Sequence, residues 1–261
     1  MNDGNGQVVW ITGGGSGIGR SLALLYASKG YQVVISGRRE DKLWETQSMH
    51  SQKESIVTMV CDVCVELDVQ STVQKIVDQF QRLDILLANA GFAMGGSVVE
   101  LSHEAWAKQM DVNLFGLLHC VRHAYPHLVK TGGRIALVSS VMAYTRTYKT
   151  GAYAASKSAV TAIGETLHIE LQGTNVSCTV IHPGFVESEI GQVDATGHYN
   201  PALKDKRPKQ LFWTSEKAAG VMYTAIQKRK KMYTFTMHGT IAVLLARFVP
   251  SLMYWVAVGR K

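Results

Sequence analysis

Near its N-terminus the chain reads Val8-Val-Trp-Ile-Thr12, then Gly13-Gly-Gly-Ser-Gly-Ile-Gly19, then Arg20-Ser-Leu-Ala-Leu-Leu-Tyr-Ala-Ser-Lys29. The first run predicts a buried β-branched strand, and the third has the apolar spacing of a helix. The glycines permit a tight turn that can approach a pyrophosphate, whose charge then meets free amides at the helix N-terminus. The spacing Gly13-x-x-x-Gly17-x-Gly19 departs from G-x-G-x-x-G and by itself also fits a plain flexible turn. A second strand-like run, Tyr31-Gln-Val-Val-Ile-Ser36, follows one βαβ unit later and favours the nucleotide interpretation.

Length and composition indicate one α/β domain. The 261 residues are 46% hydrophobic, which is enough to bury a substantial core. Strand-like runs such as Val176-Ser-Cys-Thr-Val-Ile181 alternate with amphipathic helical patterns such as residues 70–80. This alternation predicts a parallel sheet with helices on both faces. We expect a single domain over residues 1–239, followed by an apolar extension over residues 240–261.

The opening Met1-Asn-Asp-Gly-Asn-Gly6 lacks the basic-then-apolar pattern of a secretion signal, so we expect a cytoplasmic protein. Four cysteines give no case for disulfides in that compartment. The pair Cys61-x-x-Cys64 has no second pair to complete a zinc site, so buried thiols are the better interpretation.

Tyr153 and Lys157 lie four residues apart in Gly151-Ala-Tyr-Ala-Ala-Ser-Lys157. A helix brings such positions onto one face, and an ammonium beside a phenol lowers its pKa and makes it a usable proton donor. Ser140 ends the apolar run Arg134-Ile-Ala-Leu-Val-Ser-Ser140, so its hydroxyl could hydrogen-bond a substrate carbonyl at a strand tip. The Tyr-x-x-x-Lys pair alone is a weak signal, and its weight comes from the glycine-rich turn upstream.

The order and spacing of six motifs carry a family resemblance: Thr12-Gly-x-x-x-Gly-Ile-Gly19, Asn89-Ala-Gly91, Asn113, Ser140, Tyr153-x-x-x-Lys157 and Pro183-Gly184. Taken together, they resemble the classical short-chain dehydrogenases/reductases over roughly residues 7 to 190. The resemblance implies a Rossmann-like, doubly wound, seven-stranded, mostly parallel sheet. It implies that Tyr153 is the proton donor or acceptor, that Ser140 orients the carbonyl, and that Lys157 lowers the tyrosine pKa and holds the nicotinamide ribose. Asn113 would keep a helix locally open and anchor a water in a proton relay.

The same resemblance assigns the cofactor site. Asn89-Ala-Gly91 would border the adenosine, Asp62 would flank the adenine, and Pro183-Gly184 would turn the chain around the nicotinamide. The usual threonine after Pro-Gly is matched by Ser188, which can still donate to the carboxamide. The implied cofactor-binding residues are Thr12, Gly13, Gly15, Ser16, Gly17, Ile18, Gly19, Ser36, Arg38, Arg39, Asp62, Val63, Asn89, Ala90, Gly91, Tyr153, Lys157, Pro183, Gly184, Val186 and Ser188.

Charge at the end of the second strand indicates NADP(H). An NAD site usually places a carboxylate there to accept from the ribose hydroxyl, whereas this chain has Gly37 followed by Arg38 and Arg39. Guanidinium groups suit a 2′-phosphate because they are planar, bidentate donors. The alternative is a solvated helix start in which the arginines pair with Glu40 and Asp41.

The charged and histidine-rich segments are less specific. His119, His123 and His127 recur at helical spacing without an acidic partner between them, so we expect no metal site and a polar helix flank, with a subunit contact as one use. The run Lys204-Asp-Lys-Arg-Pro-Lys209 falls in an expected substrate lid over about residues 185–215 and either recruits an acidic carrier or anionic membrane, or is a solvated loop. Stacking aromatics are not interleaved with the basic residues, so nucleic acid is not expected as a partner.

The C-terminal region is unusually apolar. After an expected last strand, Tyr233-Thr-Phe-Thr-Met237, residues 241–258 are nearly all hydrophobic but contain Arg247 and Pro250. A kinked hairpin or interfacial helix at the cytoplasmic membrane face, with Tyr254 and Trp255 at headgroup level, fits better than a spanning helix. The alternative is a pair of short helices that close the substrate pocket or form a dimer contact.

The predicted activity is reversible hydride transfer between NADP(H) and a carbonyl or secondary alcohol. A lipophilic substrate is suggested by Phe92, Met94, Phe185 and the apolar C-terminus, resembling members that act on ketosphinganine, steroids, retinoids or acyl chains. The alternative is that these residues belong to the core. The alternatives are a soluble 3-ketoacyl-thioester reductase and a non-catalytic NADP-binding regulatory or scaffolding protein. The resemblance also implies a homodimer or homotetramer built on the long helices around residues 102–130 and 152–171.

Overall fold

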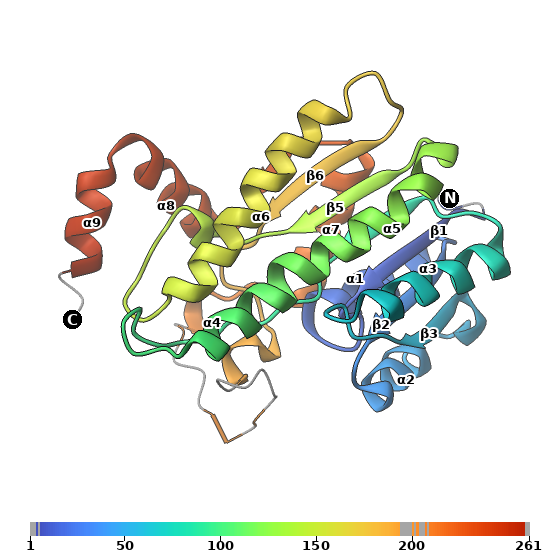
Figure 1. Ribbon diagram of the computed structural model, residues 1–261, viewed down its shortest axis with the longest axis horizontal. Helices are drawn as coiled ribbons and strands as arrows, with labels where there is room; N and C mark the ends of the chain where they lie inside the picture. The colour runs from blue at the N-terminus through green and yellow to red at the C-terminus, as the bar shows by residue number, and fades with distance from the viewer. Residues whose placement is uncertain are drawn as a thin grey trace.

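The computed structural model describes Gly4, residues 6–193, Asn200, residues 202–203, Arg207 and residues 209–258. Within these residues seven strands form one sheet in the order β3-β2-β1-β4-β5-β6-β7, and its pairings are all parallel (Figure 1). The strands are β1 (Val8–Thr12), β2 (Gln32–Gly37), β3 (Ile56–Val60), β4 (Ile85–Ala88), β5 (Arg134–Val138), β6 (Ser177–His182) and β7 (Met232–Thr234). The predicted doubly wound, Rossmann-like fold is confirmed.

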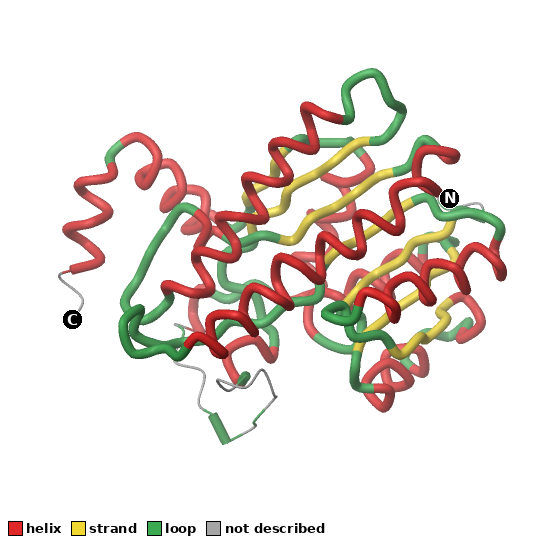
Figure 2. Tube along the Cα trace, in the orientation of Figure 1, coloured by secondary structure: helices red, strands yellow, loops and turns green. Residues whose placement is uncertain are grey.

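Helices cover both faces of the sheet (Figure 2). On one face α1 packs against α7, and on the other α3 packs against α5, with α6 beside them. The helices are α1 (Gly17–Ser28), α2 (Glu40–Ser48), α3 (Glu66–Phe80), α4 (His103–Met110), α5 (Gly116–Thr131), α6 (Gly151–Glu170), α7 (Ser215–Gln227), α8 (Met237–Phe248) and α9 (Pro250–Val258).

The central strands are buried on both faces, which explains their continuous apolar runs. In β1 the side chains of Val9 and Ile11 join the core cluster under α1 and α7, whereas Val8 and Trp10 join the cluster under α3 and α5. The alternation follows from the two-residue period of a strand. The indole N–H of Trp10 donates to Ser36 Oγ at 3.0 Å, so the largest buried side chain of this strand has its polar atom satisfied.

The strand order reverses between β1 and β4, because the chain first builds outward through β2 and β3 and then through β5, β6 and β7. In open parallel sheets, ligands bind beyond the carboxyl ends of the strands at such a reversal. The glycine-rich turn after β1 and Asn89 after β4 therefore lie together at this position, and the segments that follow β5 and β6 lie on the same edge.

The C-terminal region departs from the predicted strand over residues 233–237. The strand β7 ends at Thr234, and Met237 already belongs to α8. Thr236 adopts φ 70° and ψ 130°, a strained conformation for a β-branched residue, and its hydroxyl caps α8 by accepting from Gly239 N. The chain breaks again at Val249–Pro250 into α9. In the described part of the chain no helix is long and apolar enough to cross a bilayer.

Candidate active site

Thr12 ties the glycine-rich turn to the loop after β4. Its buried hydroxyl accepts hydrogen bonds from the backbone N–H groups of Asn89 (3.0 Å) and Ala90 (2.9 Å). In return, the side-chain amide of Asn89 donates to the Thr12 carbonyl at 2.9 Å. These reciprocal bonds hold the two strand ends on either side of the reversal in one fixed arrangement, and they place the predicted residues Thr12, Asn89 and Ala90 together.

The glycines of the turn are required where the backbone is left-handed or closely packed. Gly13 has φ 69° and Gly17 has φ 51°. A Cβ atom on Gly19 would lie 2.2 Å from the Gly13 carbonyl oxygen, which no side chain tolerates. Ser188, from the segment after β6, lies over Gly17, since a Cβ atom there would be 3.1 Å from the Ser188 Cβ. The turn is therefore a tight cradle at the N-terminus of α1, next to the predicted carboxamide-binding residue.

The arginines at the end of β2 are placed differently from one another. Arg38 is exposed, whereas Arg39 reaches across to the glycine-rich turn, with its Nη2 3.4 Å from Ser16 Oγ and 2.5 Å from Glu189 Oε2. The Glu189 contact was not predicted, because the sequence alternatives for these arginines were Glu40 and Asp41. A cation beside Ser16 remains in position to meet an anion bound at the turn.

Other predicted cofactor residues have structural partners. The Ser36 hydroxyl is buried and accepts from Trp10, so in this position it supports the core. Asp62 Oδ1 accepts from the backbone N–H of Cys64 at 3.0 Å, and Val63 is buried against Gly116. These residues shape the turn after β3 at the same sheet edge as the glycine-rich turn.

Ser140 and Tyr153 meet beyond the end of β5. Ser140 Oγ accepts a hydrogen bond from the backbone N–H of Met142 at 3.1 Å, so the hydroxyl proton of Ser140 is free to donate. A hydrogen bond from Ser140 lowers the pKa of the Tyr153 phenol. Burial acts in the opposite direction and is the stronger effect, so the pKa of Tyr153 lies above its ordinary value. A further lowering comes from the positive charge of Arg207.

Lys157 is not among the groups that shift the Tyr153 pKa in the protein by itself, so its predicted lowering of that pKa stays a prediction for the site with a bound cofactor. The Lys157 ammonium is buried, donates to the Val138 carbonyl at 2.8 Å, and lies 5.8 Å from the centroid of the Tyr153 ring. Burial lowers the pKa of Lys157 itself to about 8. The helix therefore brings both side chains to one face as predicted, and desolvation sets the direction of both pKa shifts.

Asn113 lies in a π-helical segment, Asp111–Phe115, between α4 and α5. Its side-chain amide accepts from the Phe92 N–H at 3.0 Å and donates to the Phe92 carbonyl at 2.9 Å and to Ser156 Oγ at 3.0 Å. The local widening of the helix agrees with the expectation that this residue keeps it open. Asn113 and Lys157 both border Gly91, because a Cβ atom there would lie 3.0 Å from Asn113 Oδ1 and 3.4 Å from Lys157 Nζ.

A buried hydroxyl network behind Lys157 was missed by sequence reasoning. Ser139 Oγ and Thr161 Oγ1 both donate to the Lys157 backbone carbonyl, at 2.8 and 3.0 Å, and lie 2.8 Å apart. His182 Nε2 is 3.0 Å from Thr161 Oγ1, and burial lowers the pKa of His182 to about 4, so the ring is neutral. The network fixes α6 against β5 and β6 and so positions Lys157. Its members are ordinary strand and helix residues in the sequence, which carries no pattern that marks them.

The segment after β6 forms an aromatic wall beside the site. The turn residue Gly184 packs against Thr236, and Val186 pairs with Trp213. Phe185 stacks on Phe212 at a centroid separation of 5.9 Å and on His238 at 5.3 Å.

Two other residues of the predicted apolar pocket lie elsewhere. Phe92 and Met94 are core residues, with exposed fractions of 4% and 2%, so the core alternative holds for these two and their use as pocket residues is corrected. They follow β4 directly and are covered by the helices of the α3–α5 face. Of the predicted lid cations, Arg207 lies over Phe212, while Lys204 and Lys206 fall outside the described residues.

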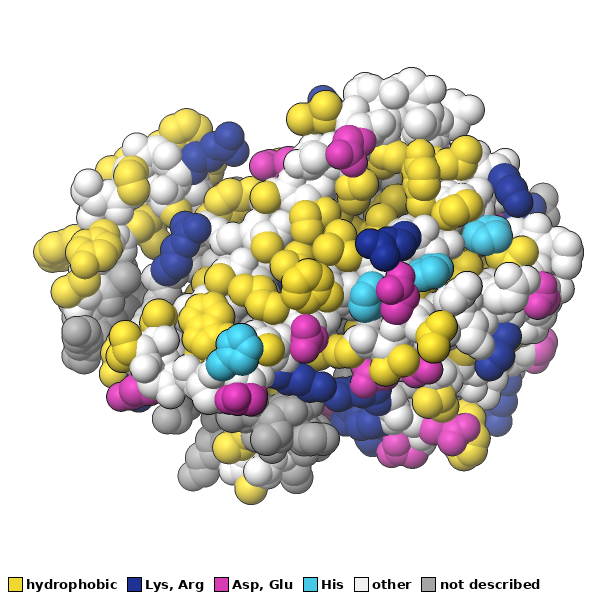
Figure 3. Space-filling view, in the orientation of Figure 1, with side chains coloured by type: hydrophobic (Ala, Val, Ile, Leu, Met, Phe, Trp, Pro, Cys, Tyr) yellow, Lys and Arg dark blue, Asp and Glu magenta, His cyan; other side chains and the backbone are white. Residues whose placement is uncertain are grey.

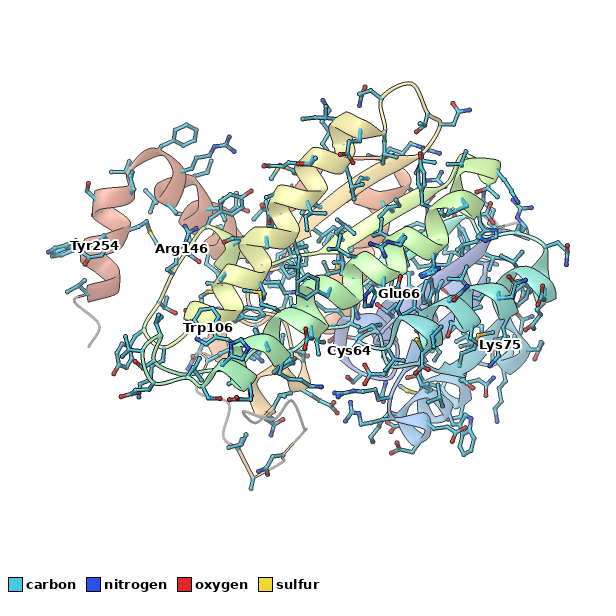
Figure 4. The ribbon with its side chains drawn as sticks, viewed as in Figure 1. Cys64, Glu66, Lys75, Trp106, Arg146 and Tyr254 are labelled. Atoms are coloured by element: carbon cyan, nitrogen blue, oxygen red, sulfur yellow. The ribbon has the colours of Figure 1, made fainter. Side chains whose placement is uncertain are left out.

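The histidine row on α5 meets an acidic partner from another element. Glu66, at the start of α3, lies 3.1 Å from His123 Nε2, 3.0 Å from Arg122 and 4.0 Å from His119 Nε2 (Figure 4). The hydrogen bond from His123 lowers the pKa of Glu66. Among the described residues no group of His, Cys, Asp or Glu side chains is arranged to hold a metal ion. The four cysteines are free thiols.

The site fits a nicotinamide dinucleotide on its own geometry. The left-handed glycines and the α1 N-terminus provide an anion cradle, with the Arg39 cation at its rim. Gly91 keeps clear the space beside Asn113 and Lys157, which a larger residue would fill. Residues Gly13, Gly17, Gly91 and Lys157 would hold the group, and Ser140 and Tyr153 lie where a substrate would meet it.

Comparison with known proteins agrees with this geometry. The family described as short chain dehydrogenase matches residues 7–197. The chain is 37% identical over 191 residues to an 11-beta-hydroxysteroid dehydrogenase A of Sesamum indicum, covering 72% of this chain and 54%, or about half, of that relative. It is 34% identical to an uncharacterised oxidoreductase of Staphylococcus saprophyticus, covering 70% of this chain and 80% of the relative.

Solved structures place the fold in the same group. A short chain dehydrogenase/reductase from Burkholderia phymatum in complex with NAD superposes with a TM-score of 0.84 at 27% identity, covering 94% of each chain. An alcohol dehydrogenase from Thermococcus sibiricus complexed with 5-hydroxy-NADP shares the fold with a TM-score of 0.75 at 24% identity, covering 88% of this chain and 95% of that one. With the glycine-rich cradle, the Ser140–Tyr153 contact and Lys157 on one sheet edge, the chain belongs to the short-chain dehydrogenase/reductase family of oxidoreductases.

Proposed function

We propose that this protein transfers a hydride between NADP(H) and the carbonyl or secondary alcohol group of a lipophilic small molecule. The observation that carries the proposal is the meeting of Ser140 and Tyr153 at the sheet edge that also holds the glycine-rich cradle. A bound nicotinamide dinucleotide supplies or accepts the hydride. The chain has to orient the substrate, exclude water and move one proton.

The side chains suit these tasks. Because burial raises the pKa of Tyr153, the phenol is protonated at neutral pH and can donate its proton to a carbonyl oxygen during reduction. Ser140 can turn its hydroxyl toward the same oxygen and orient it. Lys157, with a pKa lowered to about 8, can exchange a proton near neutral pH, and Asn113 borders Gly91 together with its ammonium. In the oxidation direction the phenolate form of Tyr153 takes the alcohol proton.

The direct test replaces Tyr153 with Phe, which removes the proton but keeps the ring. We expect turnover of ketone or alcohol substrates to fall by about 10²-fold or more, in line with the usual contribution of a general acid, while the NADPH dissociation constant stays within about twofold. A variant that keeps full turnover would refute the assignment. A wild-type protein that binds NADPH tightly and oxidises it with no member of a broad carbonyl and thioester panel would instead support a regulatory role.

The preference for NADP(H) rests on the end of β2. No carboxylate follows this strand at Gly37, and Arg39 lies at the rim of the cradle. A 2′-phosphate would meet this guanidinium and the exposed Arg38. Arg38→Asp should raise the Michaelis constant for NADPH by about tenfold or more and leave that for NADH nearly unchanged. An equal loss for both cofactors would contradict the preference.

A lipophilic substrate is supported by the aromatic wall of Phe185, Phe212 and His238 beside the catalytic side chains. The neighbouring helices α8 and α9 extend this apolar character away from the site, and we propose a peripheral membrane contact there. We also propose a homodimer or homotetramer through the α4–α5 and α6 surface, where Phe115 and Ile169 are exposed. Light scattering on the purified protein measures the oligomer directly, and a monomeric mass would remove that part.

A further inference from the structure

Helices α8 and α9 carry an apolar surface that nothing in the described part of the protein covers. We call it the C-terminal apolar face and define it as Met237, Ile241, Leu244, Phe248, Tyr254 and Trp255, all of them exposed. The four residues on α8 are spaced i, i+4, i+7 and i+11, so they form one stripe along the helix. Such a stripe normally faces a protein core, whereas here it faces outward.

The second helix strengthens this observation. The helix α9 packs on α8 and projects from the body of the protein (Figure 1). Figure 4 shows Tyr254 pointing away from the rest of the chain. Leu252 and Val258 are exposed together with Tyr254 and Trp255, and residues 250–258 contain no charged residue. An uncharged helix with large exposed apolar side chains is stabilised when protein or lipid covers those side chains.

The charge of this region favours an anionic surface. Residues 237–258 contain one arginine, Arg247, no lysine and no acidic residue. Arg247 is exposed beside the α8 stripe, next to Phe248, and Arg146 projects from the loop beside α8 (Figure 4). Figure 3 shows hydrophobic and basic side chains together over this lobe. Aromatic and long apolar side chains with flanking cations are typical of helices that lie at a lipid headgroup boundary.

The same helix begins inside the wall of the active site. Gly239, in the first turn of α8, packs against Val141 of the Ser140 loop and against Gly184, because a Cβ atom there would lie 3.0 Å from Val141 Cγ1 and 3.5 Å from Gly184 Cα. The neighbouring His238 stacks on Phe185 at 5.3 Å. The C-terminal apolar face therefore starts at Met237, one residue before His238 of the aromatic wall.

We infer that the C-terminal apolar face docks onto a bilayer with anionic headgroups and presents the active site to molecules dissolved in that bilayer. With twelve residues in α8 and nine in α9, each helix is too short to span the hydrocarbon core, so both lie in the interface plane. The inference rests on the proposed function for its substrate class, but lipid docking itself can be measured without turnover.

The test measures sedimentation of the full chain with vesicles of phosphatidylcholine, with and without phosphatidylglycerol. We compare the wild type with Phe248→Glu/Trp255→Glu, which changes two side chains exposed at 72% and 73%. The matched control is Trp44→Glu/Leu67→Glu, which adds the same charge at side chains exposed at 56% and 74% on α2 and α3. We expect the wild type and the control to bind anionic vesicles equally, and the C-terminal variant to bind at least tenfold more weakly.

Three results would overturn the inference: a wild type that does not sediment with anionic vesicles, equal binding by all three proteins, or equal weakening in both variants. A second copy of the chain is the competing occupant. Light scattering that shows the C-terminal variant dissociating, together with a wild type that ignores vesicles, would identify the face as a subunit contact.

Activity separates this inference from the proposed function. All three proteins should reduce a water-soluble ketone with NADPH equally in the absence of lipid, and only the C-terminal variant should lose at least tenfold in rate on a ketone dissolved in anionic vesicles. If none of them turns over any carbonyl while the wild type still binds vesicles, the proposed function fails and the docking stands. Equal rates for all three proteins on the vesicle-dissolved ketone would refute the delivery of substrate from the bilayer.

Discussion

Replacing Lys157 with Met should make the protein more stable while it abolishes catalysis. Lys157 is 4% exposed, and its ammonium donates a hydrogen bond to the Val138 carbonyl at 2.8 Å. Burial lowers its pKa from 10.5 to about 8. Met has a similar length and no charge, so it can fill the same space without the cost of desolvating a cation.

The magnitude follows from the pKa. At about 1.4 kcal/mol per pH unit, a fall from 10.5 to about 8 corresponds to roughly 3 kcal/mol of destabilisation by the charged form. The lost hydrogen bond to Val138 offsets roughly 1–2 kcal/mol of that. We therefore expect the variant to be more stable at pH 7 by about 1–2 kcal/mol, which raises the melting temperature by roughly 2–6 °C in a protein of this size.

The pH dependence gives the sharper measurement. Below about pH 8 the lysine is charged in both the folded and the unfolded chain, so the full penalty applies to the wild type. Between about pH 8 and 10.5 the unfolded chain binds more protons than the folded one, so the wild type gains stability relative to the variant as the pH rises. Urea unfolding of both proteins from pH 7 to 10.5 should show the gap between their unfolding free energies closing.

Lys157→Arg is the control, because arginine keeps its charge throughout this range and its stability should not converge on that of Lys157→Met. A Met variant that is less stable than the wild type at pH 7 would refute the reasoning. A stability gap that does not change between pH 7 and 10.5 would also refute it, since the penalty would then not come from the lysine charge.

Three further predictions concern the cradle and its support. Gly19→Ala places a methyl group 2.2 Å from the Gly13 carbonyl oxygen and should weaken NADPH binding by about tenfold or more in a fluorescence titration. The control is Gly220→Ala, where the methyl group meets no atom within 4 Å and should stabilise α7 by about 0.5–1 kcal/mol. Asn113→Leu leaves the Phe92 backbone groups without their partner and should lower the free energy of unfolding by roughly 2–4 kcal/mol in urea. His182→Phe should displace Lys157 and so narrow the kcat pH profile by moving its alkaline limb to lower pH, and His182→Gln should restore the wild-type profile. An unchanged profile in the Phe variant would refute the idea that His182 positions Lys157.

Much of the fold could be predicted from the sequence because its signals are local. The β-branched run of β1, the glycines of the turn and the apolar stripe of α1 each depend on neighbours within a few residues. The strand ends also fell within about two residues of those expected, apart from the last strand, where Thr236 turns the chain into α8. The i, i+4 spacing was enough to bring Tyr153 and Lys157 onto one helix face.

The energetics of the site could not be predicted in this way. Whether the Tyr153 pKa rises or falls depends on how deeply the phenol and Lys157 are buried, and burial is set by strands and loops far away in the sequence. For the same reason the pairing of Arg39 with Glu189 and of His123 with Glu66 was not foreseen, since each joins elements that meet only in the folded chain.

The sequence by itself determined the parallel α/β fold, the glycine-rich turn and the choice of candidate site residues, because backbone conformation and helical periodicity are encoded over short distances. Only the tertiary structure decided which of these side chains are desolvated, that Phe92 and Met94 are core residues, and that the α8 stripe faces outward. Burial is a property of the whole packed chain, and it governs both the protonation of Lys157 and the exposure of the C-terminal apolar face.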